Sequence, residues 1–259
     1  MTAGMHRLIS LPFSHYVEKA RWALDRSGID YREERYMPGF SMAAVAWATW
    51  GRGGRSDRVS SRFSVPVLLL GDGRILTSSG DIARFADHEA ELGWYRDPRA
   101  AELEARFHDR LGPHTRRVAY DLAFDDDSVL DDLARRNVPA RQAALFHWLA
   151  PVVEQLVTRG LAVTPERASR SLERIRKELD EVGTLLQDGR PYLLGDRFSA
   201  ADLTFACMLV PVLQPSRAEG FGADLSPMSE LHARAVELVT EVREHPAGAF
   251  ALRLFAQDR

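Results

Sequence analysis

The first ninety residues alternate short apolar runs with segments whose apolar positions recur at helical spacing. Residues 8–11 predict a strand. Residues 16–27 predict a helix, because Val17, Ala20 and Leu24 fall three or four residues apart. Further strands are predicted at 30–36, 67–70 and 75–76, and further helices at 42–50 and 80–87. The predicted order is therefore strand, helix, strand, helix, strand, strand, helix.

Strand signals almost vanish after Asp97-Pro98, and helical periodicity takes over. Helices are predicted roughly over 98–124, 138–159, 165–187, 199–213 and 228–243. This change of pattern predicts a domain boundary near residues 91–97. The expected fold is an α/β domain over residues 1–90, followed by an all-α domain over residues 97–259.

Composition and charge narrow the class of protein. Of the 259 residues, 45% are hydrophobic, which is enough to form hydrophobic cores. The formal net charge of -3 argues against a protein that binds nucleic acid and against a polybasic protein of the membrane surface. The single cysteine excludes an intramolecular disulfide and a cysteine-rich metal site, and it is consistent with a reducing compartment. No signal pattern or membrane-spanning run is found. A soluble, cytoplasmic protein without nucleic-acid or membrane partners is expected.

The junction between the first strand and the first helix is a candidate chemical site. Ser14 lies where the strand has ended and the helix begins, beside backbone N–H groups that have no partner inside the helix. Such a position stabilises negative charge on a bound group. Ser14 could equally be a helix N-cap and nothing more, because serine is a preferred capping residue.

Two further segments contain candidate binding residues. Pro66 precedes a buried apolar run, so it marks the entry to a strand, either as an ordinary trans proline or with a cis bond to Val65. Ser78 and Ser79 precede the next predicted helix. Ser79 is expected to cap that helix, whereas Ser78 and the free N–H groups are suited to holding a carboxylate.

Four segments, in their order and spacing, resemble the cytosolic glutathione S-transferase superfamily. The segments are Pro12-Phe13-Ser14-His15-Tyr16-Val17-Glu18-Lys19-Ala20-Arg21, Val65-Pro66-Val67-Leu68, Ser78-Ser79-Gly80-Asp81-Ile82 and Ser199-Ala200-Ala201-Asp202. They are similar, in turn, to the family's catalytic turn and first helix, its cis-proline element, its glutathione-binding turn and the capping box of a buried helix. The resemblance implies a thioredoxin-like first domain and an all-α helical bundle as the second.

The resemblance also implies a mechanism, in which Ser14 donates a hydrogen bond to the sulfur of glutathione and stabilises its thiolate. Val65 would offer its backbone to the cysteinyl part of the peptide, and Pro66 would shape that edge. Ser78 and Ser79 would hold the γ-glutamyl carboxylate. The glycine carboxylate would need a cation from the preceding loop, which offers four arginines: Arg52, Arg55, Arg58 and Arg62. Glutathione or a related low-molecular-weight thiol is thus implied as co-substrate, with no metal.

By the same resemblance, the electrophile would bind between the two domains. The residues expected to line its pocket are Leu11, Tyr16, Arg106, Phe107, Arg110, His114 and Tyr120. Trp47 and Trp50 would either cover the site or pack in the core. Members of the family are usually homodimers that place the first domain of one subunit against the helical domain of the other. A small-molecule thiol, an electrophile and a second subunit are therefore the expected partners.

Other functions stay open beside the leading prediction. The chain could be a catalytically silent member of the fold that works as a binding or stress-response protein. It could also be a disulfide-reducing thioltransferase, although reductive members of the family carry cysteine where this chain has Ser14. The leading prediction is a detoxification enzyme that adds an activated thiol to a small apolar electrophile.

Overall fold

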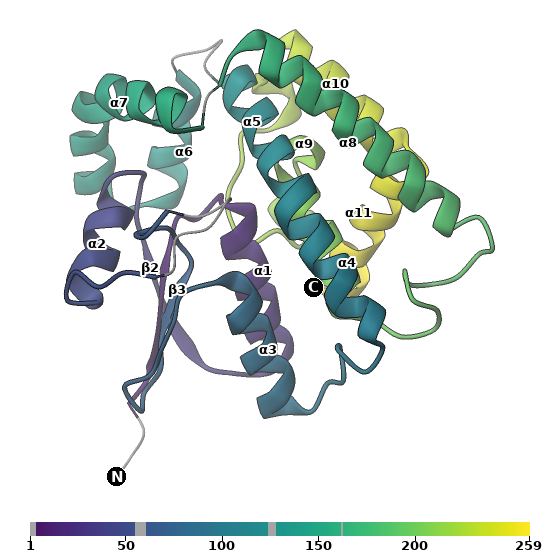
Figure 1. The fold of residues 1–259 in the computed structure, drawn as a ribbon. Helices are drawn as coiled ribbons and strands as arrows, with labels where there is room; N and C mark the ends of the chain where they lie inside the picture. Colours follow the sequence, from purple (N-terminus) through teal and green to yellow (C-terminus); the bar gives the residue numbers. More distant parts are fainter. Residues whose placement is uncertain (1–3, 55–60, 124–127, 162) are drawn as a thin grey trace.

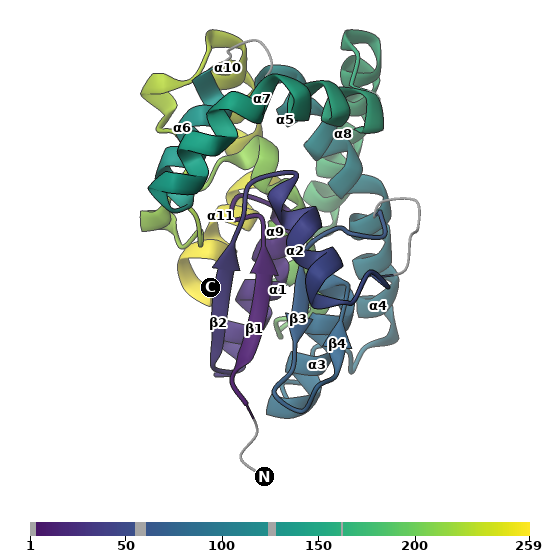
Figure 2. The ribbon, with the colours of Figure 1, turned by 90° about the vertical axis from the view of Figure 1, so that its left-hand side faces the viewer.

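A mixed four-stranded sheet forms the centre of the first domain (Figure 1). The computed structural model describes residues 4–54, 61–123, 128–161 and 163–259. The strands are β1 (His6–Ser10), β2 (Tyr31–Arg35), β3 (Val67–Leu69) and β4 (Ile75–Leu76), in the order β2-β1-β3-β4 (Figure 2). β1 runs parallel to β2 and antiparallel to β3, which is antiparallel to β4. The predicted strands are confirmed to within two residues at each end.

Helices cover both faces of this sheet: α1 (His15–Arg26), α2 (Phe40–Ala48) and α3 (Ser79–Ala90). Successive strand residues point to opposite faces. Leu8 therefore packs with Leu24 of α1 and Ile82 of α3. Ile9 packs on the other face with Val45 of α2. Figure 1 accordingly shows α2 on one side of the sheet and α1 and α3 on the other, which is a thioredoxin-like arrangement.

Helices build the described part of the second domain. They are α4 (Pro98–Arg106), the π-helical turn η1 (Phe107–Leu111), α5 (Gly112–Ala123), α6 (Ser128–Asn137), α7 (Ala140–Leu161), α8 (Pro165–Leu185), α9 (Ala200–Leu213), α10 (Ala233–Glu244) and α11 (Pro246–Asp258), with 3-10 turns η2 (Arg217–Glu219) and η3 (Met228–Glu230). No helix in the described ranges is both long enough and apolar enough to cross a bilayer.

The observed helices differ from the predicted ones in two ways. The sequence pattern joins α4, η1 and α5 into one helix, and it misses α6 and α11. Pro246 and Gly248 normally signal a break, which hides α11. The structure explains Gly248, because a Cβ there would lie 1.7 Å from the carbonyl oxygen of Val242. The glycine is needed for close packing of α11 against α10.

The helix α9 lies in the centre of the second domain and is buried along nearly its whole length. The predicted capping interaction at its start is present. The Asp202 carboxylate accepts the backbone N–H of Ser199 at 2.8 Å, the Ser199 hydroxyl at 2.6 Å, and the N–H of Leu193 at 2.8 Å. Burial raises the pKa of the Asp202 carboxyl in spite of these bonds. Cys207 lies on the same helix as a buried thiol, as predicted.

The two domains share one apolar core and a buried ion pair. Trp22 of α1 packs on Phe255 of α11, with ring centroids 4.8 Å apart. Lys19 Nζ of α1 lies 2.6 Å from Glu104 Oε1 of α4, and the Lys19 side chain has no exposed surface. The predicted boundary at 91–97 falls in the connection between α3 and α4. It separates two patterns of secondary structure, and one hydrophobic cluster is built from residues on both sides of it.

Replacing Lys19 by Met is expected to destabilise the fold by about 3 kcal/mol, because removing one partner of a buried pair leaves the other charge uncompensated. Glu104 would keep Arg84 at 2.6 Å and the Tyr95 hydroxyl at 2.9 Å, which sets the loss at the lower end of the usual range. Urea unfolding followed by circular dichroism measures the change.

The matched control is Lys177→Met, because the Lys177 side chain is 79% exposed and its ion pair with Glu181 spans 3.9 Å. It is expected to change stability by less than about 0.5 kcal/mol. If both substitutions lowered the free energy of unfolding by the same amount, the buried ion pair would contribute no more to stability than an exposed one.

Candidate functional site

A cavity of about 770 Å³ lies between the two domains. The first domain contributes the turn that precedes α1, the start of α2 and the segment that precedes β3. The second domain contributes residues of α5, α6, α7, α9 and α10. Ser14 and Val65 both line this cavity, so the fold brings together two of the predicted site residues that lie far apart in the sequence.

Ser14 starts α1 without using its side chain as a cap. Its backbone is extended (φ -74°, ψ 126°), and its carbonyl oxygen accepts the N–H of Glu18 at 2.9 Å, as an N-cap carbonyl does. The Ser14 hydroxyl makes no capping hydrogen bond. The hydroxyl therefore lies at the positive end of a helix, on the wall of a cavity, with its capping function unused.

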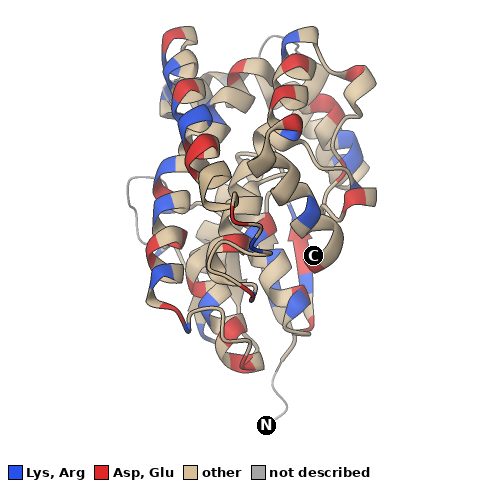
Figure 3. Ribbon diagram, turned by 90° about the vertical axis from the view of Figure 1, so that its right-hand side faces the viewer, with Lys and Arg blue, Asp and Glu red and all other residues tan. Residues whose placement is uncertain are grey.

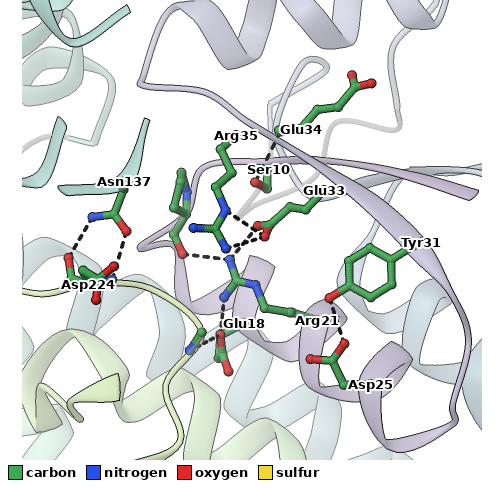
Figure 4. A network of polar contacts seen from close by, with 12 residues as sticks. Ser10, Glu18, Arg21, Asp25, Tyr31, Glu33, Glu34, Arg35, Asn137 and Asp224 are labelled. Atoms are coloured by element: carbon green, nitrogen blue, oxygen red, sulfur yellow. Dashed lines mark hydrogen bonds and ion pairs between the residues drawn. The ribbon is translucent and has the colours of Figure 1, made fainter. Parts of the chain in front are cut away.

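The turn before Ser14 is held by the buried guanidinium of Arg21 (Figure 4). Arg21 Nη2 donates to the carbonyl oxygen of Pro12 at 3.1 Å and to Glu33 Oε1 of β2 at 2.7 Å. Arg21 Nη1 pairs with Glu18 of the same helix. Burial works against the charged guanidinium, but the two carboxylates outweigh it and raise the pKa of Arg21. The position of the turn is thus fixed by bonds that connect it to the sheet and to α1.

The Val65-Pro66 peptide bond is cis, which decides between the two predicted forms of this proline. Val65 is half-buried and lines the cavity, whereas Pro66 is buried beneath it at the entry to β3. Val65 therefore lies on the wall of the cavity, directly before a buried strand.

Of the two serines at the start of α3, Ser78 caps the helix, and not Ser79 as predicted. Ser78 is the N-cap, because its backbone is extended and its hydroxyl accepts the N–H of Asp81 at 3.0 Å. Ser79 is the first helical residue and is only 2% exposed. Its Oγ has no hydrogen-bond partner among the described residues, although unpaired buried hydroxyls are costly. Neither serine lines the large cavity.

The predicted electrophile-binding residues divide into two groups. Leu11, Tyr16 and Tyr120 line the cavity. Phe107 and His114 do not line it. The same holds for Arg106 and Arg110.

The reason lies in the register of the helices that follow α4. Phe107 is fully buried against Phe205 of α9, with ring centroids 5.1 Å apart. His114 faces α8, where Nδ1 lies 3.1 Å from Ser171 Oγ. The π-helical turn at 107–111 shifts the register of α5, so the cavity is lined by later residues, among them Arg116.

Several lining residues were not singled out by the sequence: Phe13, His15, Met42, Phe63, Arg116 and His232. His15 is 3% exposed, and its Nε2 has no hydrogen-bond partner among the described residues. Burial, together with Arg116 and His108, lowers the pKa of His15 well below its ordinary value. His15 is therefore a neutral imidazole beside Ser14. Its place directly after the serine at a helix start is a signal that could have found it.

Charge on the described wall of the cavity comes from Arg116 alone. Of the predicted loop arginines, Arg55 and Arg58 lie outside the described residues, and Arg52 is exposed. Arg62 donates to the carbonyl oxygens of Arg52 at 2.6 Å and Gly51 at 2.9 Å, so it braces the loop. The described ranges contain no group of three or more His, Cys, Asp or Glu side chains placed to hold a metal ion.

Trp47 and Trp50 neither line the cavity nor pack in a core. Their side chains are 86% and 89% exposed. The prediction that they pack in the core is therefore wrong.

Two protein-family models match the chain. The model of the glutathione S-transferase N-terminal domain matches residues 13–89, and that of the glutathione S-transferase C-terminal domain matches residues 165–225. Together they cover more than half of the 259 residues. The chain belongs to the glutathione S-transferase superfamily. Among curated protein sequences, none matches it.

Solved structures share the fold over nearly the whole chain. A glutathione S-transferase from Xanthobacter autotrophicus aligns with a TM-score of 0.59 and 17% identity, over 97% of this chain and 93% of its own. A glutathione transferase from Phanerochaete chrysosporium gives 0.59 and 17%, over 98% and 97%. A glutathione S-transferase of Ceriporiopsis subvermispora in complex with glutathione gives 0.56 and 19%, over 97% and 96%. At these identities the similarity establishes the fold.

The environment of His114 predicts an unusual titration. Burial, with the nearby guanidinium groups of Arg174 and Arg117, lowers the pKa of His114 to about 4. The folded protein therefore binds this proton less readily than the unfolded chain, whose histidine has a pKa of about 6.5. The neutral imidazole favours the folded state at higher pH, and this contribution to stability is lost as the pH falls from about 6.5 toward 4. An NMR titration of the imidazole resonances, assigned with His114→Asn, is expected to show this midpoint.

Arg174→Gln removes one like charge and is expected to raise the His114 midpoint by up to about one unit. The control is Arg176→Gln on the same helix, whose guanidinium is paired with Glu241 at 2.6 Å. A wild-type midpoint near 6.5 would contradict the described burial of this imidazole.

Proposed function

We propose that this protein is a glutathione transferase in which the Ser14 hydroxyl donates a hydrogen bond to the sulfur of a bound thiol. One observation carries the proposal: the Ser14 hydroxyl, at the start of α1, makes no capping bond and lines the same cavity as Val65 of the cis Val65-Pro66 pair. Membership of the glutathione S-transferase superfamily supports it.

The energetic demand on the site is moderate. A free thiol has a pKa near 8.5, and lowering it by about two units requires about 2.7 kcal/mol of thiolate stabilisation. A hydroxyl donor and the N–H groups at a helix start together supply about 1–3 kcal/mol. Ser14 thus stabilises the thiolate, and the sulfur attacks the electrophile.

The remaining groups follow from the same proposal. Val65 pairs through its backbone with the cysteinyl part of the thiol peptide, at the edge that Pro66 shapes. Ser78 and Ser79 hold the γ-glutamyl carboxylate, for which the buried Oγ of Ser79, which has no partner among the residues that the structure describes, is a suitable donor. Arg52 is a described and exposed candidate for the glycine carboxylate. A related low-molecular-weight thiol would use the same groups.

The electrophile in this proposal is small and apolar. Leu11 and Tyr16 lie on the wall of the cavity, whose other described lining residues are mostly apolar. Arg116 adds a positive charge that suits an electrophile with electron-withdrawing substituents. We further propose that the protein is a cytoplasmic detoxification enzyme and that it works as a homodimer, as the family resemblance implies.

The alternatives have less support. A catalytically silent member would need Ser14 only as a cap, and its hydroxyl makes no capping bond. A thioltransferase would need a reactive cysteine. The single cysteine, Cys207, is buried in α9, where burial raises its pKa well above the ordinary value.

Ser14→Ala tests the proposal. The substitution is expected to lower conjugation of glutathione to chlorodinitrobenzene by about tenfold or more, because it removes one charge-assisted hydrogen bond to the sulfur. The pKa of bound glutathione, followed by thiolate absorbance, is expected to rise by about one unit. The control is Ser27→Ala at the opposite end of α1, where the hydroxyl bonds the Leu24 carbonyl oxygen at 2.8 Å.

Calorimetric titration of the wild-type protein with reduced glutathione comes first. An absence of heat and of a thermal shift at millimolar ligand would sink the transferase proposal. An unchanged rate in folded Ser14→Ala would show that the hydroxyl does not act on the sulfur.

Ser79→Ala is expected to weaken glutathione binding by about tenfold, because the carboxylate loses a hydrogen bond to a buried donor. The substitution is not expected to change binding of the analogue that lacks the γ-glutamyl α-carboxylate. Calorimetry with the two ligands measures the difference. Equal losses for both would show that Ser79 acts on the fold and not on the carboxylate.

A further inference from the structure

Exposed large apolar side chains gather on two neighbouring helices. Those on or next to α2 are Met42, Trp47 and Trp50, and those on α7 are Leu145, Trp148, Leu149, Val152 and Leu156. We name these eight residues the α2–α7 face. Elsewhere in the described residues, the exposed large apolar side chains are Met5, Ile75 and Leu185. The face therefore holds most of the large apolar side chains that the described fold leaves in water.

The helices α2 and α7 lie side by side. Phe146 and Val153, on the inner side of α7, belong to one apolar cluster with Met37 and Phe40, which precede and begin α2. Figures 1 and 2 both place the two helices on one side of the molecule, and this side faces the viewer in Figure 2. Their outer sides therefore contribute to one surface.

The outer side of α7 carries an apolar stripe with an arginine at each end. Exposed residues recur along it at three- or four-residue spacing: Arg141, Leu145, Trp148, Val152, Leu156 and Arg159. This spacing places them on one side of the helix. Apolar residues that include tryptophan, flanked by arginines, are typical of a helix that lies in the surface of a bilayer.

The segments that contain the face are basic, although the chain as a whole is slightly acidic. Residues 36–63 and 140–161 hold six arginines against two acidic residues, whereas the whole chain has 34 Lys and Arg and 37 Asp and Glu. Among the side chains that the structure describes on α2 and α7, none is acidic. The net charge of -3, which argues against a membrane surface for the chain as a whole, thus conceals a local excess of positive charge.

The opposite side of the molecule is different. Figure 3 shows basic and acidic residues together along its helices, as is usual for a solvated surface. The combination of exposed indoles and one sign of charge therefore distinguishes the α2–α7 face from that side.

We propose that the α2–α7 face docks on the surface of a bilayer that contains anionic phospholipid. Trp47, Trp50 and Trp148 are 86%, 89% and 80% exposed, and indoles prefer the boundary between lipid headgroups and acyl chains. The arginines beside them attract the phosphate groups of anionic lipids. The helix α7 lies on the bilayer and does not span it.

A second copy of the chain fits this face less well than a bilayer does. In a two-fold dimer the same patch meets itself, so the arginines of one copy would face those of the other. Like charges brought together in this way cost free energy. Anionic headgroups neutralise the same arginines.

The docked face includes the edge of the cavity. Met42 and Leu156 belong to the α2–α7 face and line the cavity as well. An apolar electrophile dissolved in the bilayer would therefore reach the cavity without crossing water. This consequence rests on the proposed function, whereas the docking itself uses no thiol chemistry and can fail while the proposed function stands.

Sedimentation of the full chain with large vesicles tests the docking. The protein is expected to bind phosphatidylcholine vesicles that contain about 30% phosphatidylglycerol at least about tenfold more tightly than vesicles of phosphatidylcholine alone. Binding is expected to weaken as the salt concentration rises. Tryptophan emission is expected to shift to the blue as the exposed indoles enter lipid, and Trp22 and Trp94, which are buried in the core, contribute no shift.

Variants of α7 test the apolar stripe and the arginines separately. Trp148→Asp is expected to weaken binding at least about tenfold, because a carboxylate replaces an interfacial indole. Arg141→Glu combined with Arg159→Glu is expected to weaken binding at least about tenfold and to reduce its salt dependence. Leu145→Asp replaces Trp148→Asp if that variant does not fold, as judged by circular dichroism.

The matched controls lie outside the face. They are Ile75→Asp on β4 and Arg197→Glu before α9, whose native side chains are exposed, and both are expected to leave binding unchanged. An absence of binding at about 1 mM anionic lipid would overturn the inference, as would binding that the α7 variants leave unchanged. A dimer that Trp148→Asp dissociates, in a protein that does not bind the vesicles, would assign the face to a second copy and overturn it too.

Discussion

The buried guanidinium of Arg21 is the interaction on which the site and its surroundings depend. A buried charge is costly unless partners surround it, and here partners come from distant parts of the chain: Glu18 on α1, Glu33 on β2 and the carbonyl oxygen of Pro12. Burial acts to raise the pKa of Glu33, but Arg21 outweighs it and the net pKa is lowered. The same carboxylates that satisfy Arg21 therefore fix the sheet, α1 and the turn before Ser14 in one arrangement. The Ser14 hydroxyl, which is catalytic in the proposed function, would gain its precise position from such rigid support.

Local sequence patterns predicted the parts of the fold that local forces determine. The strands and α1 follow from periodicity, and the start of α9 follows from the spacing of Ser199 and Asp202, since a capping box needs only four consecutive residues. The helix α11 could not be predicted in this way. Gly248 breaks the pattern, and its reason, a close approach to the carbonyl oxygen of Val242, exists only after the chain has folded. The extra turn at η1 is likewise invisible in the sequence, and it changes which residues of α5 face inward.

In the candidate site, too, some features could be predicted from the sequence and others depend on the folded structure. Ser14 and Val65 could be paired before the structure was known because their segments resemble a known family, and the cavity contains both. For Phe107 and His114 the resemblance indicates only the helix that borders the pocket, which gives the order of its residues but not the direction of their side chains. The sequence predicted Ser79 as the cap instead of Ser78, because a cap and the next residue differ by only one position, and backbone angles decide between them. The sequence does not indicate His15, because its burial, and the lack of a partner for its Nε2 within the described ranges, are properties of the folded neighbourhood.

The pairing of Glu18 with Arg259 has a consequence for the order of events during synthesis. Arg259 Nε reaches Glu18 Oε1 at 2.7 Å across a sequence separation of 241 residues, and the Asp258 carbonyl oxygen accepts the indole N–H of Trp22 at 3.0 Å. At a translation rate of about 5–20 residues per second, α1 leaves the ribosome on the order of ten seconds or more before these partners do. Until then the Glu18 carboxylate has Arg21 of its own helix but not Arg259, and the Trp22 indole N–H lacks the Asp258 carbonyl oxygen. The packing of α1 is thus completed only by residues that are synthesised much later, so the first domain reaches its final contacts after most of the helical domain has been made.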